Sequence, residues 1–297
     1  MKPSPTVNRV KKLKQSVAFN IFRLISFLIV VILFVILAFI AVRGASALSW
    51  EFLTAMPEDG MTKGGIYPAI IGTLLLVLGS MIFAFPIGVL SGIYINEYAK
   101  DGIVKRFMKL MTNNLAGIPS IVFGLFGMSL FVNTLEFGDS ILAGSLTLGL
   151  LALPVVIRTT EESLKSVDNN FRHGSYALGA TKLQTIRRVV LPISLPNILT
   201  GLILSIGRVS GETAPILFTV AAYFLPKLPT SIYDQVMALP YHLYVITTSG
   251  TNIEESRRMA YGTALVLILI VLLVNPVSYT HLRAHETKAN LVCRLLL

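Results

Sequence analysis

The strongest pattern in the chain is a series of six apolar segments that carry almost no charge. Each approaches or exceeds the roughly 20 apolar residues that an upright helix needs to cross a bilayer. The segments are residues 24–42, 66–95, 115–135, 141–157, 198–225 and 259–274. The pattern therefore predicts an all-α membrane protein with six transmembrane helices.

Proline and glycine positions indicate how these helices pack. Four prolines lie within the segments, and each removes a backbone donor and favours a kink. These prolines are Pro86, Pro119, Pro154 and Pro215. Gly117, Gly124 and Gly127 could let neighbouring backbones approach closely, although ordinary helix packing also explains them. We therefore predict a bent, closely packed bundle.

Composition and charge support a membrane protein with both termini in the cytoplasm. The chain is 54% hydrophobic and 13% charged, with a net charge of +10. Its basic residues fall in separate loops, which argues against nucleic-acid binding and follows the positive-inside rule. The arm 1–23 and the loop 158–197 are basic, whereas the loop 43–65 is not. The apolar run at 24–42 is longer than the hydrophobic core of a signal peptide, so we expect that this helix is retained and not cleaved. The single cysteine excludes an intrachain disulfide.

The long cytoplasmic loop predicts a protruding elbow of two short helices. Thr181 can cap a helix over Lys182 to Val190, with Gln184 completing a capping box. Gly179 forms the joint before this helix, and Pro192 and Pro196 are expected to stop it. A loop lying on anionic lipid is the alternative, but it would not need this spacing of glycine and prolines.

The elbow also carries a resemblance to a known family. Gly179, nine residues and then Val-Val-Leu-Pro at 189–192 resemble the signature of ABC importer permeases, although its opening Glu-Ala-Ala is replaced by His-Gly-Ser at 173–175. The resemblance implies a type I ABC importer (MetI-like) permease bundle whose loop docks on an ATPase subunit. The coupling residues that it implies are His173, Gly174, Ser175, Gly179, Ala180, Leu191 and Pro192.

An arginine and a glutamate lie four residues apart in the fifth apolar segment. Arg208 and Glu212 belong to a stripe that recurs at spacings of four and three, which would place it on one helix face. The other members of the stripe are Gly201, Ser205, Pro215 and Thr219. A charge at the bilayer centre costs about 2.5 to 3.5 kcal/mol, so the pair should face protein or water. It could be a buried ion pair or part of a polar pathway.

Three further stretches resemble the permeases of phosphate-specific ABC importers, and the PstA-type more than the PstC-type subunit. They are GETAPILFT at 211–219, NNLAGIPSIVFGLFG at 113–127 and GIYINEYA at 92–99. This resemblance implies that Arg208, Glu212, Ser205 and Thr213 line the phosphate pathway. A guanidinium can offer two hydrogen bonds to phosphate, and a nearby carboxylate keeps the attraction modest enough for release.

The resemblance also implies the partners of the chain. No Gly-x-x-x-x-Gly-Lys-Ser/Thr motif occurs, so we expect that ATP is hydrolysed by a partner and not by this chain. The resemblance implies that two ATP-binding subunits are that partner. A PstC-type permease would complete the pathway in the bacterial inner membrane. An external phosphate-binding protein would dock on the loops 50–65 and 226–258. We expect no cofactor and no nucleic-acid partner, with membrane lipid around the helices.

Two alternatives and an unusual tail remain. The cargo could be sulfate, molybdate or another oxyanion, and a membrane enzyme would need a convergent set of polar residues that the sequence does not suggest.

The permease core is expected at 66–275. Residues 276–297 resemble translated adapter read-through, so we expect them to be non-native. A zinc site of His281, His285 and Cys293 is the alternative for that tail.

Overall fold

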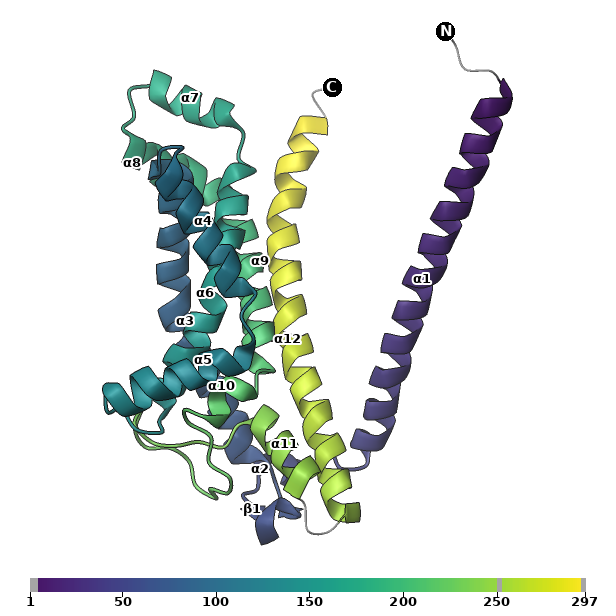
Figure 1. The fold of residues 1–297 in the computed structure, drawn as a ribbon, viewed down its shortest axis with the longest axis vertical. Helices are drawn as coiled ribbons and strands as arrows, with labels where there is room; N and C mark the ends of the chain where they lie inside the picture. The colour runs from purple at the N-terminus through teal and green to yellow at the C-terminus, as the bar shows by residue number, and fades with distance from the viewer. Residues whose placement is uncertain (1–4, 250–252, 295–297) are drawn as a thin grey trace.

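The computed structural model describes residues 5–249 and 253–294, with side chains described for 15–249 and 253–273. Most of the chain is helical, and the long helices run between the two ends of an elongated bundle (Figure 1). In chain order the elements are α1 (Pro5–Ala45), α2 (Trp50–Thr54), β1 (Pro57–Glu58), η1 (Asp59–Met61), β2 (Lys63–Gly64), α3 (Tyr67–Ile93), η2 (Tyr94–Tyr98), α4 (Ile103–Ala116), α5 (Ser120–Gly127), η3 (Met128–Thr134), α6 (Ile141–Lys165), α7 (Asn169–Ala177), α8 (Lys182–Thr185), η4 (Ile186–Val190), α9 (Leu191–Ser210), α10 (Ala214–Leu217), α11 (Leu239–Ser249) and α12 (Ile253–Arg294). The two short strands pair antiparallel.

Five helical stretches in the described part of the chain are long and apolar enough to cross a membrane. They are Gln15–Ala45, Tyr67–Tyr98, Ile141–Lys165, Lys182–Ser210 and Ile253–Leu273. They confirm five of the six predicted spans, although the one predicted at 198–225 is displaced along the chain. The predicted all-helical membrane fold is therefore confirmed.

The third predicted span, at 115–135, falls in a pair of helices that together count as one span with a sharp bend, at the proline where a kink was predicted. The structure has α4 and then α5 with η3, and the two parts meet at an angle of 98°. The break falls at Gly117 to Pro119, where a proline that cannot donate its backbone nitrogen interrupts the helix. As a result α4 crosses part of the bundle, whereas α5 lies across it near the end that carries α2 (Figure 1).

The fifth predicted span is wrong at both ends. The helix begins at Lys182, because η4 is wound as a π-helix and continues directly into α9 through Pro192 and Pro196. The Leu191 N–H donates to the Ile186 carbonyl, so the chain accommodates the prolines by a wider turn instead of stopping. At the other end, α9 ends at Ser210.

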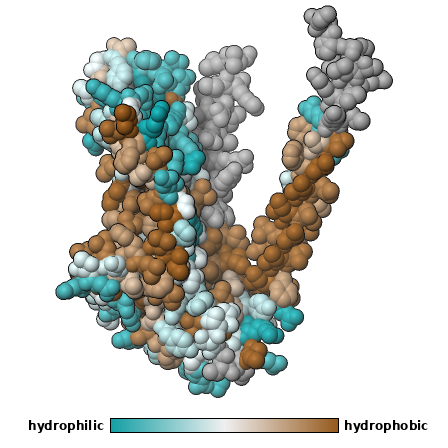
Figure 2. Space-filling model, viewed as in Figure 1, coloured by the Kyte–Doolittle hydropathy of each residue, from teal (hydrophilic) through white to brown (hydrophobic). Residues whose placement is uncertain are grey.

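The two ends of the bundle match the predicted topology. The start of α1 and the end of α12 lie at the same end as the elbow formed by α7 and α8, and α2, β1 and α11 lie at the opposite end (Figure 1). Hydrophobic residues cover most of the coloured part of α1 and the middle of the bundle, while hydrophilic residues gather at both ends (Figure 2). This arrangement fits a chain that crosses a membrane several times.

The core of the bundle is the pair α3 and α6. Small residues on α3 let the two backbones approach, because a methyl group added at Gly88 would lie 2.6 Å from a Val156 methyl carbon. Leu76 and Leu148 are buried in the same layer. The close approach of a neighbouring backbone is confirmed at Gly124, whereas Gly127 packs against the Thr147 side chain. At Gly117 the nearest atom is the Asn114 carbonyl oxygen, 3.5 Å from an added methyl.

Candidate functional site: a charged helix break and a protruding elbow

The predicted charged pair lies where α9 ends. Gly211 caps α9, and the chain then runs irregularly to α10, which begins at Ala214 and has Pro215 in its first turn. Proline suits the first turn of a helix because its missing N–H would be unpaired there in any case. Arg208 is therefore in the last turn of one helix, and Glu212 lies in the break before the next.

This geometry holds Arg208 and Glu212 together but leaves the arginine accessible. Arg208 Nε lies 3.6 Å from Glu212 Oε1, and the two side chains are 40% and 17% exposed. An arginine in the last turn of a helix is stabilised by the negative end of the helix dipole. The pairing that the spacing predicted is confirmed, and much of the guanidinium remains open to a ligand.

The single helical stripe that the sequence predicted is wrong beyond Ser210. Ser205 is buried, and its hydroxyl donates to the Gly201 carbonyl at 2.9 Å. Thr213 is half-buried beside Glu212 in the break. Glu212 and Thr213 thus lie in the break, Arg208 lies in the last turn of the helix before it, and Ser205 is buried within the helix packing. The prediction of one stripe is wrong because the periodic spacing continues through residues 211–213, which do not form a helix.

The short helix α10 packs against α5. A methyl group added at Gly124 would lie 2.8 Å from the Ala214 carbonyl oxygen. Glycine is therefore required here by the close approach of the two backbones. This contact places α5 beside the segment that follows Glu212.

At the other end of the bundle, the structure confirms the elbow. Gly179 adopts a φ of +81°, which glycine tolerates at no steric cost, and turns the chain between α7 and α8. Thr181 then caps α8, and the Gln184 side chain accepts from the Thr181 N–H at 2.8 Å. The predicted capping box is confirmed. The predicted stop at Pro192 is wrong, as described above.

The predicted coupling residues lie on this elbow with different exposures. His173, Gly174, Gly179 and Pro192 are exposed, whereas Ala180 and Leu191 are partly buried. The Ser175 hydroxyl lies 2.9 Å from the Thr185 hydroxyl and ties α7 to α8. Large apolar side chains are also exposed on the elbow: Phe171, Tyr176, Leu178 and Leu183. Leu178 is 91% exposed, which indicates a surface for a partner.

One uninterrupted helical stretch joins the elbow to the charged pair. It spans the 29 residues from Lys182 to Ser210, or about 43 Å at about 1.5 Å per residue. The capping box of the elbow lies at its start and Arg208 in its last turn. A movement of the elbow would therefore reach the charged pair directly along one helix.

Three ion pairs in the structure were not predicted from the sequence. Arg172 on α7 contacts Glu97 on η2 at 2.8 Å, with side chains 13% and 7% exposed. Lys109 of α4 and Lys165 of α6 both contact Glu161 of α6. In two of these pairs the partners are far apart in the sequence. The third pair, Lys165 with Glu161, lies beyond the predicted end of the span 141–157. Only the basic character of these loops signalled them.

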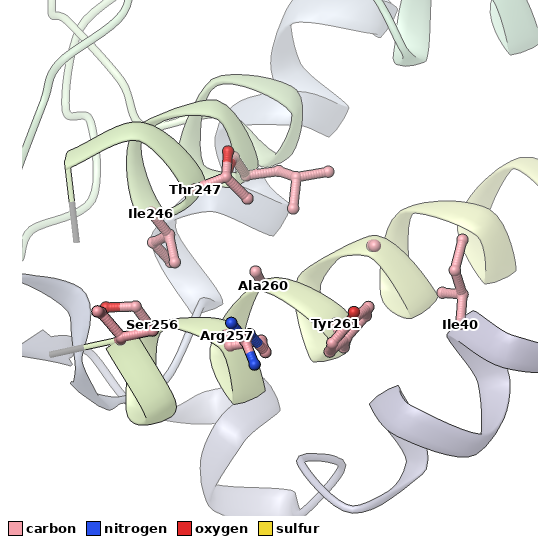
Figure 3. A pocket seen from close by; sticks show the side chains of 10 residues that line it. Ile40, Ile246, Thr247, Ser256, Arg257, Ala260 and Tyr261 are labelled. Carbon is pink, nitrogen blue, oxygen red and sulfur yellow. The ribbon is translucent and has the colours of Figure 1, made fainter.

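A cavity of about 400 Å³ lies elsewhere, between α1, α11 and α12. Ile40, Thr247, Arg257 and Tyr261 are among the residues that line it (Figure 3). None of the predicted pathway or coupling residues contributes to it. The candidate site is therefore the charged helix break together with the elbow.

A multi-pass helical bundle with a protruding elbow and a charged helix break defines a membrane transport subunit. The chain belongs to the family of binding-protein-dependent transport system inner membrane components, whose sequence model matches residues 84–289. The predicted membership of the ABC importer permeases is thus confirmed.

Individual relatives agree with this family. The chain is 39% identical to the phosphate transport system permease protein PstA of Mycobacterium leprae, over 89% of this chain and 87% of that protein. It is 32% identical to the probable ABC transporter permease protein YqgI of Bacillus subtilis, over 89% of this chain and 94% of that protein. The resemblance to PstA-type permeases is confirmed.

A solved structure shows the same fold. A bacterial ABC transporter involved in the import of the acidic polysaccharide alginate matches with a TM-score of 0.60 and 18% identity. The match covers 92% of this chain and 99% of that chain. The predicted type I permease bundle is therefore confirmed.

Proposed function

We propose that this chain is a transmembrane permease subunit of an ATP-driven inorganic phosphate importer and forms half of its translocation pathway. One observation carries the proposal: a single helical stretch has the elbow at one end and an accessible arginine, Arg208, near the other. The relatives named as phosphate transport permeases support phosphate as the cargo.

Arg208 is the residue that binds the ion in this proposal. A planar guanidinium stays charged in any environment and can donate two parallel hydrogen bonds to a phosphate. Glu212 competes for the same guanidinium at 3.6 Å, so the ion is held weakly enough to leave. Thr213 adds a hydroxyl beside the pair, and Ser205 acts by fixing the helix packing beneath it.

The elbow is the docking surface for the ATP-binding subunit. Leu178 and Leu183 expose large apolar side chains on a segment that projects beyond the bundle, which favours burial against a partner. His173, Gly174, Ser175, Gly179 and Ala180 shape this surface, and Leu191 and Pro192 join it to α9. Closure of two ATP-binding subunits would move the elbow and, through α9, the charged break.

The remaining parts of the assembly follow from the same proposal. A PstC-type permease supplies the other half of the pathway in the bacterial inner membrane. An external phosphate-binding protein docks at the opposite end, on α2 with the β1–β2 hairpin and on the segment 226–258.

The permease core is 66–275, with a basic arm at 1–23, a first transmembrane helix at 24–42 and a coupling loop at 158–197. The side chains of 276–297 lie outside the described residues, and we propose that this tail is non-native.

Uptake by vesicles tests the proposal. The chain is assembled with the second permease and the ATP-binding subunits, and labelled inorganic phosphate is supplied with the external binding protein. Accumulation of phosphate that requires both ATP and the binding protein is expected. An assembled complex that hydrolyses ATP but accumulates no phosphate would contradict the proposal.

A further inference from the structure

The cytoplasmic end of α3 is fastened to the elbow by a buried ion pair. Arg172 Nη2 on α7 donates to Glu97 Oε1 on η2 at 2.8 Å, although the two residues are 75 positions apart in the sequence. Both side chains are at most 13% exposed. The Asn96 amide also donates to Glu97 Oε1 at 2.8 Å, which fixes the carboxylate.

The same guanidinium holds the end of α6. Arg172 Nη2 donates to the Leu164 carbonyl at 2.8 Å, and Nη1 donates to the Val167 carbonyl at 2.7 Å. Carbonyls at a helix C-terminus have no partner within the helix, so an arginine that binds them joins that helix end to its own segment. Arg172 thus joins its own helix, α7, to two other elements, η2 and the end of α6.

Further contacts hold the elbow against the same place. The Lys182 ammonium of α8 lies 4.9 Å from the centre of the Tyr98 ring on η2, within the range of a cation–π contact. Beneath it, Leu164, Val167 and Val190 form a small buried cluster with Ile93 packed against it. The elbow therefore lies on η2, which is wound as a π-helix, a form found frequently at functional sites.

We propose that Arg172 and Glu97 form a joint that transmits movement of the elbow to α3, and that both are positioning residues for coupling ATP hydrolysis to transport. This inference rests on the proposed function of the chain. Movement passes along α9 to the charged break and, through the joint, into the α3–α6 core. Without the joint the elbow moves while α3 stays behind, so ATP is hydrolysed with little cargo moved.

The ratio of phosphate transported to ATP hydrolysed tests the joint in vesicles that contain the whole complex. In Arg172→Gln and Glu97→Gln this ratio is expected to fall about tenfold, and the double variant should fall no further, because either change breaks the same contact. Arg172→Lys keeps the positive charge but lacks the planar fork of the guanidinium. This variant separates loss of the joint from a general folding defect. The matched control is Arg158→Gln, which removes an exposed ion pair within α6 alone.

An unchanged ratio in both single variants, an equal fall in Arg158→Gln, or additive losses in the double variant would overturn the proposal. Total absence of phosphate uptake by the unaltered complex would instead contradict the proposed function. A second measurement that needs no phosphate therefore decides the joint independently.

That measurement is the distance between spin labels at Asn170→Cys on α7 and Ile82→Cys on α3, in the full complex with Cys293→Ser. With Arg172 present, ATP should leave the distance unchanged, because the elbow and α3 move together. With Arg172→Gln, ATP should shift and broaden it. Equal behaviour in the two backgrounds would overturn the joint, whatever the cargo is.

Discussion

Among single residues, position 208 is one where we expect an arginine to serve better than any other cationic side chain. It lies in the last turn of α9, partly exposed and 3.6 Å from Glu212. Lysine would keep the charge but would present a compact ammonium without the planar fork that matches a phosphate.

Arg208→Lys should therefore lower phosphate uptake about tenfold, because one charge-assisted hydrogen bond contributes about 1.5 kcal/mol or more. Labelled phosphate uptake measures the effect. Arg158→Lys is the matched control, since Arg158 forms a similar pair with Glu162 four residues on but is well exposed on α6. Equal uptake by Arg208→Lys and the unaltered chain would refute a direct role for the guanidinium.

His242 predicts an acid-sensitive packing of α11, a helix that is not among the spanning ones. Its side chain is 1% exposed, and burial lowers the pKa of His242 from 6.5 to about 4. Nδ1 lies 3.2 Å from the Thr263 hydroxyl of α12. Between pH 6.5 and 4 the unfolded chain binds the proton more readily than the folded chain, so stability is lost as the pH falls.

The loss should reach about 3 kcal/mol near pH 4 at about 1.4 kcal/mol per pKa unit. Thermal unfolding in detergent across this pH range measures it. His242→Gln should flatten the pH dependence, whereas His173→Gln, at an exposed histidine on the elbow, should preserve it. A pH dependence that is the same with and without His242 would show that another group is responsible.

At the scale of elements, the contact of α5 with α10 depends on Gly124. Gly124→Ala would push a methyl group to 2.8 Å from the Ala214 carbonyl oxygen, so α5 has to move. Overpacking of this kind costs about 1 to 3 kcal/mol. A lower unfolding temperature and reduced uptake are expected, while Gly117→Ala in the same stretch should behave like the unaltered chain. Normal uptake by a stable Gly124→Ala variant would contradict the close packing.

The elbow predicts a second effect at this scale. Leu178 is 91% exposed, and burying a leucine side chain against a partner contributes about 1.5 to 3 kcal/mol. Leu178→Asp should therefore reduce copurification of the ATP-binding subunits at least tenfold. Ile103→Asp, at an 89% exposed position on α4, serves as the control. Unchanged copurification with Leu178→Asp would place the docking surface elsewhere.

Local signals in the sequence predicted some elements well and others poorly. The apolar runs located α1, α3 and α12, and the Thr181 capping box located α8, because each depends on neighbouring residues. The break after Ser210 was missed because the periodic stripe continues past it. The bend before α5 was predicted only as a kink at Pro119, and its angle of 98° was not predicted, since a proline can either kink a helix or end it.

At the scale of the whole molecule, the contacts between distant segments could not be predicted from one sequence. Arg172 and Glu97 meet only because α7 folds back over the end of α3, and loop charge alone gave no partner for either. The charged pair at 208 and 212 was predictable because its spacing is local. The chain as a whole therefore consists of an elbow, a long helix and a charged break, with the α3–α6 core joined to the elbow from the side.

The most direct test of this account is uptake of labelled phosphate by vesicles containing the complete complex and ATP, with an excess of unlabelled phosphate or sulfate. The account predicts ATP-dependent uptake that unlabelled phosphate abolishes and sulfate leaves unchanged. Equal competition by sulfate would make the charged break a general oxyanion site, and the absence of ATP-dependent uptake by an assembled complex would contradict the account.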